Sequence, residues 1–395
     1  MSLKFKLLFC VFFSFQIVGF AQQLKLSSYA QVSVITVGPG TSLNDAFGHN
    51  AFRIKDPARG LDVTYGYGEY DFEAPHFYLK FAQGKLNYLL GRIKFDRFYR
   101  FYVYQNRTMR EQVLNLSADE KQKLFDYLEN NYKPENRRYL YDFFYDNCAT
   151  KIRDVLEKTS DTKIIFHKPQ GFVPKTFREL IYSCVDRNTW GSLGIDMALG
   201  SVIDKEATPY EHMFLPKYIF DFFGTATKDG AGKLVSETHI LYQKKAQKVP
   251  SEFLSSPLFV FAVIALIILW LTYRDYKKQQ RNKLLDVVLF AFTGLIGIMV
   301  LLLWFATDHT ATALNFNLLW VFPINLFAML QLAKKQPKQW MRKYLKFLVI
   351  LLALLTLHWI VGIQQFAIGL IPLLIALAVR YMYLIYYLKK WQINK

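Results

Sequence analysis

The feature that most constrains this chain is a series of apolar stretches in its C-terminal third. From about Phe253 onward, apolar residues gather into stretches of roughly 20 residues, the length that an α-helix needs to cross a ~30 Å hydrocarbon core. The predicted spans are Pro257 to Tyr273, Leu284 to Phe305, Leu314 to Ala333, Tyr344 to Ile363 and Phe366 to Leu388. A purely soluble protein is therefore excluded. The sequence predicts a membrane domain over residues 253–395 with five transmembrane helices.

The connections between these spans alternate in charge, which predicts their orientation. The first and third connections and the C-terminal tail are rich in Lys and Arg, whereas the connections around Asp308 and Gln364 contain neither. Because basic connections stay in the cytoplasm, we expect a cytoplasmic C-terminus and an extracytoplasmic segment before Pro257. Much of the net charge of +18 is then a topology signal, and nucleic acid is not a predicted partner.

The N-terminus has the pattern of a secretory signal peptide. Lys4 and Lys6 precede an apolar run from Leu7 to Phe20, and a small residue, Ala21, follows it. We therefore assign residues 1–21 to a signal peptide; the alternative is an uncleaved first transmembrane helix. A signal peptide would deliver residues 22–252 to the extracytoplasmic side of the inner membrane, which agrees with the charge pattern.

Residues 22–252 are long enough for one domain with its own core, and their patterns change along the chain. Strand patterns occur at Gln31 to Val37, Ala46 to Ile54 and Leu61 to Tyr67. From Ser117, which forms a capping box with Glu120, the period becomes helical, and a second helix is predicted from Cys148 to Lys158. Residues 224–249 are typical of a loop or hairpin. The predicted class is α+β.

Cys148 stands where a reactive thiol would be expected. In YDFFYDNCATKIRDVLE, Asn147 is a plausible N-cap, which places Cys148 in the first turn of the following helix. The positive end of a helix favours a thiolate and is expected to lower the thiol pKa from about 8.5 toward roughly 3.5 to 7.5. Backbone N–H groups at the same place, with Asn147 as cap, would hold a developing oxyanion. The alternative is a small buried side chain.

A thiol nucleophile needs a base, and FGHNAFRI supplies His49 in a predicted strand far upstream of Cys148. A strand histidine followed by a helix-start cysteine reverses the chain order of papain. The pair resembles the site of the lecithin retinol acyltransferase and NlpC-type group, which implies a circularly permuted papain-like domain. In that group a polar side chain on the neighbouring strand orients the histidine. Among the polar residues of the next strand we favour Tyr65.

Over nearly its whole length the chain resembles the Lnb-type lipoprotein intramolecular transacylase family, which has an Lnb N-terminal periplasmic domain. The segments that carry the resemblance are FGHNAFRI, YDNCATKIRD, GIDMALGSVIDKEATPYEHMFLPKYI and TDHTATALNFNLLWVFPINL. It implies transfer of an acyl chain from the glyceryl group of a lipidated N-terminal cysteine to the α-amine of that cysteine. Cys148 would be the nucleophile that carries the acyl thioester, and His49 the base. The implied partners are lipidated proteins and membrane phospholipid, and no cofactor is implied.

Several other polar residues have two interpretations. Asp308 and His309, in an outer connection, and His358, near the outer end of a span, are either ordinary interfacial residues or a membrane-interface site for lipid. An aromatic and basic stretch at residues 77–102 is either core with a solvated face or a surface that lies on anionic headgroups. No metal is predicted, because Asp196 and the acidic residues after it lack a metal-ligand spacing.

Two other functions fit parts of the sequence. The first is a cysteine amidase or peptidase that acts on cell-wall peptide, although such an enzyme needs at most one membrane anchor. The second is a non-enzymatic membrane scaffold with a disulfide between Cys148 and Cys184, which an extracytoplasmic location would permit. A free thiol at Cys148 favours the enzyme. The sequence makes no prediction of acyl-chain specificity or oligomeric state.

Overall fold

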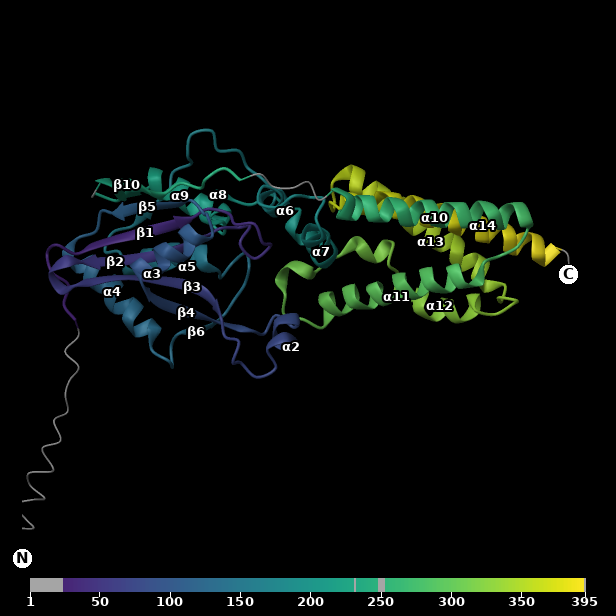
Figure 1. The fold of residues 1–395 in the computed structure, drawn as a ribbon, viewed down its shortest axis with the longest axis horizontal. Coiled ribbons are helices and arrows are strands. Elements are labelled where there is room, and N and C mark those ends of the chain that lie inside the picture. Colours follow the sequence, from purple (N-terminus) through teal and green to yellow (C-terminus); the bar gives the residue numbers. More distant parts are fainter. Residues whose placement is uncertain (1–23, 231, 248–252, 394–395) are drawn as a thin grey trace, which may run out of the picture.

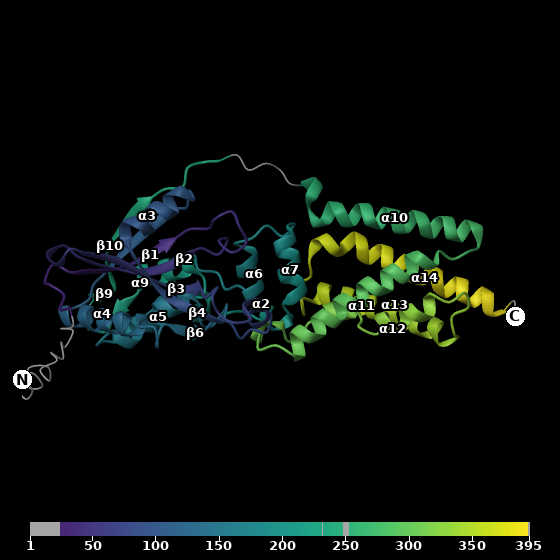
Figure 2. The same ribbon diagram turned by 60° about the horizontal axis from the view of Figure 1, so that its bottom comes forward.

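A computed structural model describes residues 24–230, 232–247 and 253–393 of the chain. The predicted signal peptide, residues 1–21, lies outside the described residues. The described chain forms a globular part of sheets and helices and then a helical bundle, and Figures 1 and 2 show the two parts lying end to end. The prediction of an α+β domain followed by a helical membrane region is confirmed.

The globular part is built around one antiparallel sheet with the strand order β10-β5-β1-β2-β3-β4-β6. Its strands are β1 (Gln31–Val37), β2 (His49–Asp56), β3 (Leu61–Tyr70), β4 (Asn87–Lys94), β5 (Met109–Leu114), β6 (Arg138–Leu140) and β10 (Val235–Tyr242). A histidine in β2 precedes a helix-start cysteine, the order expected of a permuted papain-like domain. That topology stays a prediction.

Helices cover both faces of the sheet. Successive strand residues point to opposite faces, so neighbouring residues of one strand pack against different helices. On one face, α4 (Ala118–Tyr132), α5 (Cys148–Thr159) and α9 (Pro216–Thr225) share a buried cluster with Phe52 of β2. On the other face, α3 (Phe95–Tyr104) packs against Ala51, the neighbour of Phe52. The remaining helices are α2 (Phe77–Ala82), α6 (Phe177–Tyr182), α7 (Trp190–Ala198) and α8 (Pro209–His212).

The sequence patterns located most of these elements. β1 has the predicted bounds, and β2 and β3 differ from the prediction only at their ends. Ser117 caps α4 as predicted: its hydroxyl accepts the Glu120 N–H at 3.1 Å, and the Glu120 carboxylate accepts the Ser117 N–H at 2.8 Å. The stretch from residue 224 is more than a loop. It supplies β8 (Thr227–Lys228) and β9 (Gly232–Lys233), which pair beside β7 (Ile164–Ile165), and then the edge strand β10.

In the described residues, four helices of the bundle are long and apolar enough to cross a membrane. They are α10 (Pro257–Lys278), α11 (Lys283–Phe305), α13 (Trp340–Val361) and α14 (Ile371–Ile393). They coincide with the first, second, fourth and fifth predicted spans. Both α10 and α13 pack against α14, and Figure 1 shows all four running along the long axis of the bundle.

The third predicted span, Leu314 to Ala333, is interrupted, so that five transmembrane helices stay a prediction. This segment consists of a short 3-10 helix (Phe316–Leu319), a non-helical stretch at Pro323 and the eight-residue α12 (Asn325–Leu332). This segment packs closely on α11: a Cβ at Gly297 would overlap the Val321 carbonyl oxygen, so only glycine fits there.

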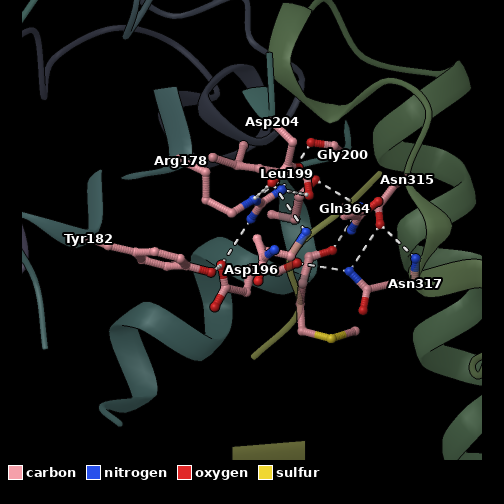
Figure 3. A network of polar contacts seen from close by, with 12 residues as sticks. Arg178, Tyr182, Asp196, Leu199, Gly200, Asp204, Asn315, Asn317 and Gln364 are labelled. Atoms are coloured by element: carbon pink, nitrogen blue, oxygen red, sulfur yellow. Dashed lines mark hydrogen bonds and ion pairs between the residues drawn. The ribbon is translucent and has the colours of Figure 1, made fainter. Parts of the chain in front are cut away.

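Buried polar contacts around Arg178 of α6 join the globular part to the bundle (Figure 3). Arg178 is fully buried. Its Nε donates to Asp204 and its Nη1 to Asp196, each at 2.9 Å. Its Nη2 donates to the carbonyl oxygens of Leu199 and Gly200 at 3.1 and 3.0 Å. One guanidinium therefore holds the whole turn between α7 and Asp204.

The bundle binds to the end of α7 and to Asp204 through the interrupted third segment and Gln365, which precedes α14. Asn315 donates to the carbonyl oxygen of Met197 at 2.9 Å, and Asn317 donates to that of Asp196 at 2.8 Å (Figure 3). The backbone N–H of Gln365 donates to the Asp204 carboxylate at 3.1 Å. The globular part is thus fixed against the near end of the bundle by hydrogen bonds.

A second buried ion cluster lies farther along the bundle, and the sequence patterns did not indicate it. Arg380 of α14 contacts Asp275 of α10 at 2.9 Å and Asp286 of α11 at 2.7 Å, and all three side chains are fully buried. Because unpaired charges in a bilayer are costly, this arrangement fixes α14 to the hairpin of α10 and α11.

Candidate active site

Cys148 is the first residue of α5, and Asn147 is the N-cap residue of that helix. The Asn147 side-chain oxygen accepts the backbone N–H groups of Ala149 and Thr150 at 2.7 and 3.0 Å. Its side-chain nitrogen donates to the carbonyl oxygens of Phe143 and Phe214 at 2.6 and 2.9 Å. The amide is therefore fully used in holding the helix start. Asn147 is thus the helix cap that the sequence predicted, and its side chain positions the start of α5.

The sulfur of Cys148 lies where β2 and β3 separate. These strands pair as far as Ala51 opposite Gly66. Beyond that pair, the backbone N–H of Asn50 donates a hydrogen bond to the Cys148 sulfur, which favours the thiolate. A Cβ at Gly68 would lie 3.8 Å from the Cys148 Cβ, and Gly68 has a φ of 96°, which favours glycine. The start of α5 is thus inserted beside the end of the β2–β3 pair.

His49 lies at the start of β2, directly before Asn50. A Cβ at Gly66 would lie 3.0 Å from the His49 Nε2. Since Gly66 and Gly68 are alternate residues of β3, the imidazole and the Cys148 side chain lie against the same short stretch of this strand. The structure therefore brings the two sequence-predicted residues into one neighbourhood. A direct contact between them stays a prediction.

The positive charge of Arg107 acts on both His49 and Cys148. It lowers the pKa of the imidazole and that of the thiol. Arg107 is only 3% exposed. Its Nε donates to the Gly38 carbonyl oxygen at 2.9 Å and its Nη1 to Asp45 at 3.1 Å, and its guanidinium lies 4.9 Å from the Tyr102 ring centroid. Its Nη2 is buried and has no hydrogen-bond partner among the described residues. A buried donor without a partner is uncommon, and here it is available to an anionic group.

Burial controls the protonation of both predicted catalytic residues. It lowers the pKa of His49 to about 4, and Arg107 adds to this effect while Asp45 opposes it. Burial raises the pKa of the Cys148 thiol to about 11, although the backbone N–H groups of Asn50, Cys148 and Ala149 favour the thiolate. The predicted low thiol pKa is therefore wrong, because desolvation outweighs the helix N-terminus. At pH 7 the pair is a neutral thiol and a neutral imidazole.

This state predicts how Cys148 reacts with iodoacetamide. Only the thiolate is alkylated, so with a pKa of about 11 the rate is expected to rise roughly tenfold per pH unit from pH 7 to pH 10. Peptide mass spectrometry of the Cys184→Ser protein would follow the peptide that contains Cys148. A rate that levels off below pH 8 would show instead that the helix N-terminus prevails over burial.

Tyr65 does not lie where it could orient His49, which corrects the predicted third catalytic residue. Tyr65 is opposite Phe52 on β2, and both belong to the buried cluster beneath α4 and α5. Because His49 is three residues from Phe52, its side chain points to the other face. The Tyr65 hydroxyl bonds to Glu129 and accepts the Arg92 Nε at 3.2 Å. Tyr65 is a core residue that anchors α4.

Glu69 is a residue that the sequence reasoning missed. A Cβ at Gly91 would overlap the Glu69 carboxylate, and Gly91 is opposite Gly66 on β3. The carboxylate therefore lies on the same face of the sheet as the His49 imidazole. Burial raises the pKa of Glu69. Neither Glu69 nor Arg107 belongs to a local motif, and only the strand register places them near His49.

The predicted membrane-interface residues make different contacts, and a shared lipid site stays a prediction. The backbone N–H of Asp308 donates to the Gln83 carbonyl oxygen at 2.8 Å, and His309 Nε2 bonds to the Phe81 carbonyl oxygen at 3.1 Å. These two contacts attach the loop after α11 to α2. His358 instead packs against Phe316 of the third segment, with ring centroids 4.6 Å apart. Asp308 and His309 therefore position α2 against the bundle.

Both described cysteines are free. Cys148 packs against the cluster beneath the sheet, whereas Cys184 packs with Phe144 and Phe177 in a separate cluster. This arrangement argues against the disulfide of the scaffold alternative. Asp196 and Asp204 bind Arg178, and within the described ranges no group of three or more His, Cys, Asp or Glu residues could hold a metal ion.

Comparisons with known proteins agree with this architecture. Residues 19–182 match the family model of the Lnb N-terminal periplasmic domain, and residues 248–391 match that of the Lnb transmembrane domain. No curated protein and no solved structure matches the chain. The two matched regions include His49 and Cys148 in the first and all four long apolar helices in the second. The chain therefore belongs to the Lnb family, as a membrane protein with a periplasmic N-terminal domain and a membrane-spanning C-terminal region.

Proposed function

We propose that this protein is a thiol acyltransferase that moves an acyl chain within a lipoprotein, from its glyceryl group to the α-amine of its lipidated N-terminal cysteine. Membership of the Lnb family supports a lipoprotein-modifying membrane enzyme. The observation that carries the chemistry is the free Cys148 at a capped helix start, beside the strand that bears His49.

The neutral state of the two residues sets the first step. His49, unprotonated at pH 7, takes the proton of the Cys148 thiol as the sulfur attacks the ester carbonyl carbon. The Asn147 cap already accepts the Ala149 and Thr150 N–H groups, so we assign the backbone N–H of Cys148 and the free Nη2 of Arg107 as donors to the tetrahedral oxyanion. The bond from carbonyl carbon to glyceryl oxygen then breaks, and the glyceryl oxygen takes the proton from His49. An acyl thioester on Cys148 and a free glyceryl hydroxyl result.

The second step returns the enzyme to its starting state. The α-amine of the lipidated cysteine attacks the thioester carbonyl carbon, the carbon–sulfur bond breaks, and the amine proton passes through His49 to the sulfur. An amide is formed and the Cys148 thiol is restored. Holding the amine and the thioester in one site can contribute several kcal/mol to lowering the barrier. The product is an isomer of the substrate, so its mass is unchanged.

The attachment of the catalytic domain favours acyl transfer over cell-wall hydrolysis. The loop before Cys148 reaches the bundle, where the Thr310 hydroxyl donates to the Asp142 carboxylate at 2.9 Å. The contacts around Arg178 fix the same end of the domain. A wall hydrolase gains reach from a mobile tether, whereas an enzyme that acts on lipid benefits from a site held at the bilayer surface.

Mass spectrometry of a diacylated lipoprotein before and after incubation with the purified protein tests this proposal. We expect an unchanged intact mass and a fragment that carries one acyl chain on the α-amine. A product heavier by one acyl group would identify a separate lipid as donor and refute intramolecular transfer. An unmodified lipoprotein together with a cleaved wall peptide would support the amidase or peptidase alternative.

We also propose that the protein lies in the inner membrane with its C-terminus in the cytoplasm, which is supported by the alternating basic connections. A reporter that is active only in the cytoplasm is expected to give signal when fused after Lys395 and none when fused after Gln365. The reverse pattern would contradict this orientation.

A further inference from the structure

An apolar groove lies between α2 of the periplasmic domain and α11 of the bundle. Its volume is about 450 Å³, within the range of roughly 300 to 1,000 Å³ that is usual for small-molecule sites. Ala82 and Gln83 line it on one side, and residues of the second half of α11, among them Met299, Leu302, Leu303 and Ala306, line it on the other.

The position of the groove identifies the chemistry of its occupant. Its α11 residues belong to the half of a membrane-spanning helix that ends at the periplasmic domain, so the groove opens within the outer half of the hydrocarbon layer. An apolar surface at that depth binds hydrocarbon chains rather than peptide or headgroup. Figure 2 shows α2 beside the end of α11 nearest the sheet.

A row of aromatic rings leads from this groove to Cys148. Phe81, which precedes the groove residue Ala82, is stacked on Phe77 with ring centroids 6.5 Å apart. The row continues from Phe77 to Tyr70 at 6.1 Å, from Tyr70 to Tyr88 at 4.9 Å and from Tyr88 to Tyr141 at 4.2 Å. At its end, a Cβ on Gly68 would touch both Tyr141, at 3.5 Å, and the Cys148 Cβ, at 3.8 Å.

We propose that this groove and the aromatic row form the binding site for the acyl chain that Cys148 transfers. The occupant is an acyl chain of the lipoprotein's own glyceryl group, with its ester at the thiol, its first methylenes over the rings and its end in the groove beside Met299. The proposal rests on the proposed function for the identity of the transferred chain. Its binding test does not require turnover.

The bundle supplies a matched control. A second apolar groove of about 340 Å³ lies between α10 and α14 and includes Leu269, Tyr273, Met382 and Tyr386. Met299 and Met382 are 46% and 52% exposed, so tryptophan at either position enters a groove rather than the packed core. Leu302→Trp is a second variant of the first groove, because Leu302 is 54% exposed. Size-exclusion chromatography and thermal melting would establish that each variant is folded.

The experiment measures binding of two synthetic lipopeptides, one with two palmitoyl and one with two octanoyl chains on the glyceryl cysteine. Full-length Cys148→Ser protein in nanodiscs of dioleoylphosphatidylcholine would be used, so that no acyl group is transferred. Met299→Trp and Leu302→Trp are each expected to raise the Kd of the palmitoyl lipopeptide by at least about tenfold, the effect of losing burial of about two methylene groups. Both should leave the octanoyl lipopeptide within about twofold, and Met382→Trp should change neither.

Equal effects of Met299→Trp and Met382→Trp would mean that both grooves hold only bulk bilayer lipid and would overturn the proposal. Equal weakening of the long-chain and short-chain lipopeptides, or failure of the protein to bind the palmitoyl lipopeptide, would overturn it as well. Chain-length-dependent binding by a protein that does not N-acylate lipoproteins would support the groove and reject only the transfer reaction.

Discussion

Replacing Cys148 by serine is expected to lower the rate of lipoprotein N-acylation by at least about a thousandfold, because a serine hydroxyl is a much weaker nucleophile beside the same base. His49→Ala is expected to have an effect of similar size, since the thiol, which has a pKa of about 11, then has no group to take its proton. Both variants would be assayed by the N-terminal fragment that carries the α-amide. Protein abundance and membrane insertion should match the wild type.

Two controls make this prediction specific. Because nucleophile and base act as one unit, the double variant Cys148→Ser, His49→Ala is expected to be no slower than Cys148→Ser alone. Cys184→Ser should keep full activity, since Cys184 packs in a separate cluster. Complete N-acylation by the Cys148→Ser protein, in cells that lack other N-acyltransferases, would exclude the thioester route.

Local sequence signals predicted the elements that carry the site. The capping box at Ser117 and the Asn147 cap determine where α4 and α5 begin, and both can be recognised within a few residues of sequence. The strand pattern placed β1 and β2 and therefore His49. The order of His49 and Cys148 along the chain then indicated which residues belong together. The predictions of these helix starts and strands succeeded because each depends on short-range backbone preferences, whereas the pairing of His49 with Cys148 stays a prediction.

The third predicted span shows where hydropathy is insufficient. Its residues are apolar enough for a transmembrane helix, but Pro323 lacks a backbone N–H and disfavours a helical conformation in the residue before it. Asn315 and Asn317 also donate hydrogen bonds to carbonyl oxygens of α7. Those partners lie more than 100 positions earlier in the chain. A sliding window cannot include contacts of that range.

A third catalytic residue cannot be predicted without the register of the strands, which local sequence patterns do not give. Tyr65 lies on the strand after His49, as the prediction requires, yet the register of β2 and β3 places its side chain on the opposite face. A shift of one residue in register would have reversed that outcome. Arg107 could not be found either, because it follows α3 and reaches the site only through the folding of β1 and β5 side by side.

Arg178→Met is expected to destabilise the protein by about 3 to 5 kcal/mol, the usual cost of removing one partner from a buried ion pair. The guanidinium is fully buried, and its loss would leave the Asp196 and Asp204 carboxylates without their cation. Asp204 also accepts the backbone N–H of Gln365, so the attachment of the bundle is weakened at the same time. Thermal melting of the purified protein would measure the effect, with Arg97→Met at an exposed position of α3 as the matched control.

The pH dependence of this loss distinguishes unpaired charge from lost packing. Burial already raises the pKa of Asp196 and Asp204 even with Arg178 present, and removing the cation would raise both values further. A carboxyl group whose pKa is higher in the folded than in the unfolded state destabilises the fold as the pH rises through the folded value. The stability difference between wild type and Arg178→Met should therefore be larger at pH 8 than at pH 5. Adding Asp196→Asn and Asp204→Asn to Arg178→Met should recover part of the stability at pH 8, because no buried charge remains. A deficit that is independent of pH and is not reduced in the triple variant would mean that Arg178 contributes packing rather than charge.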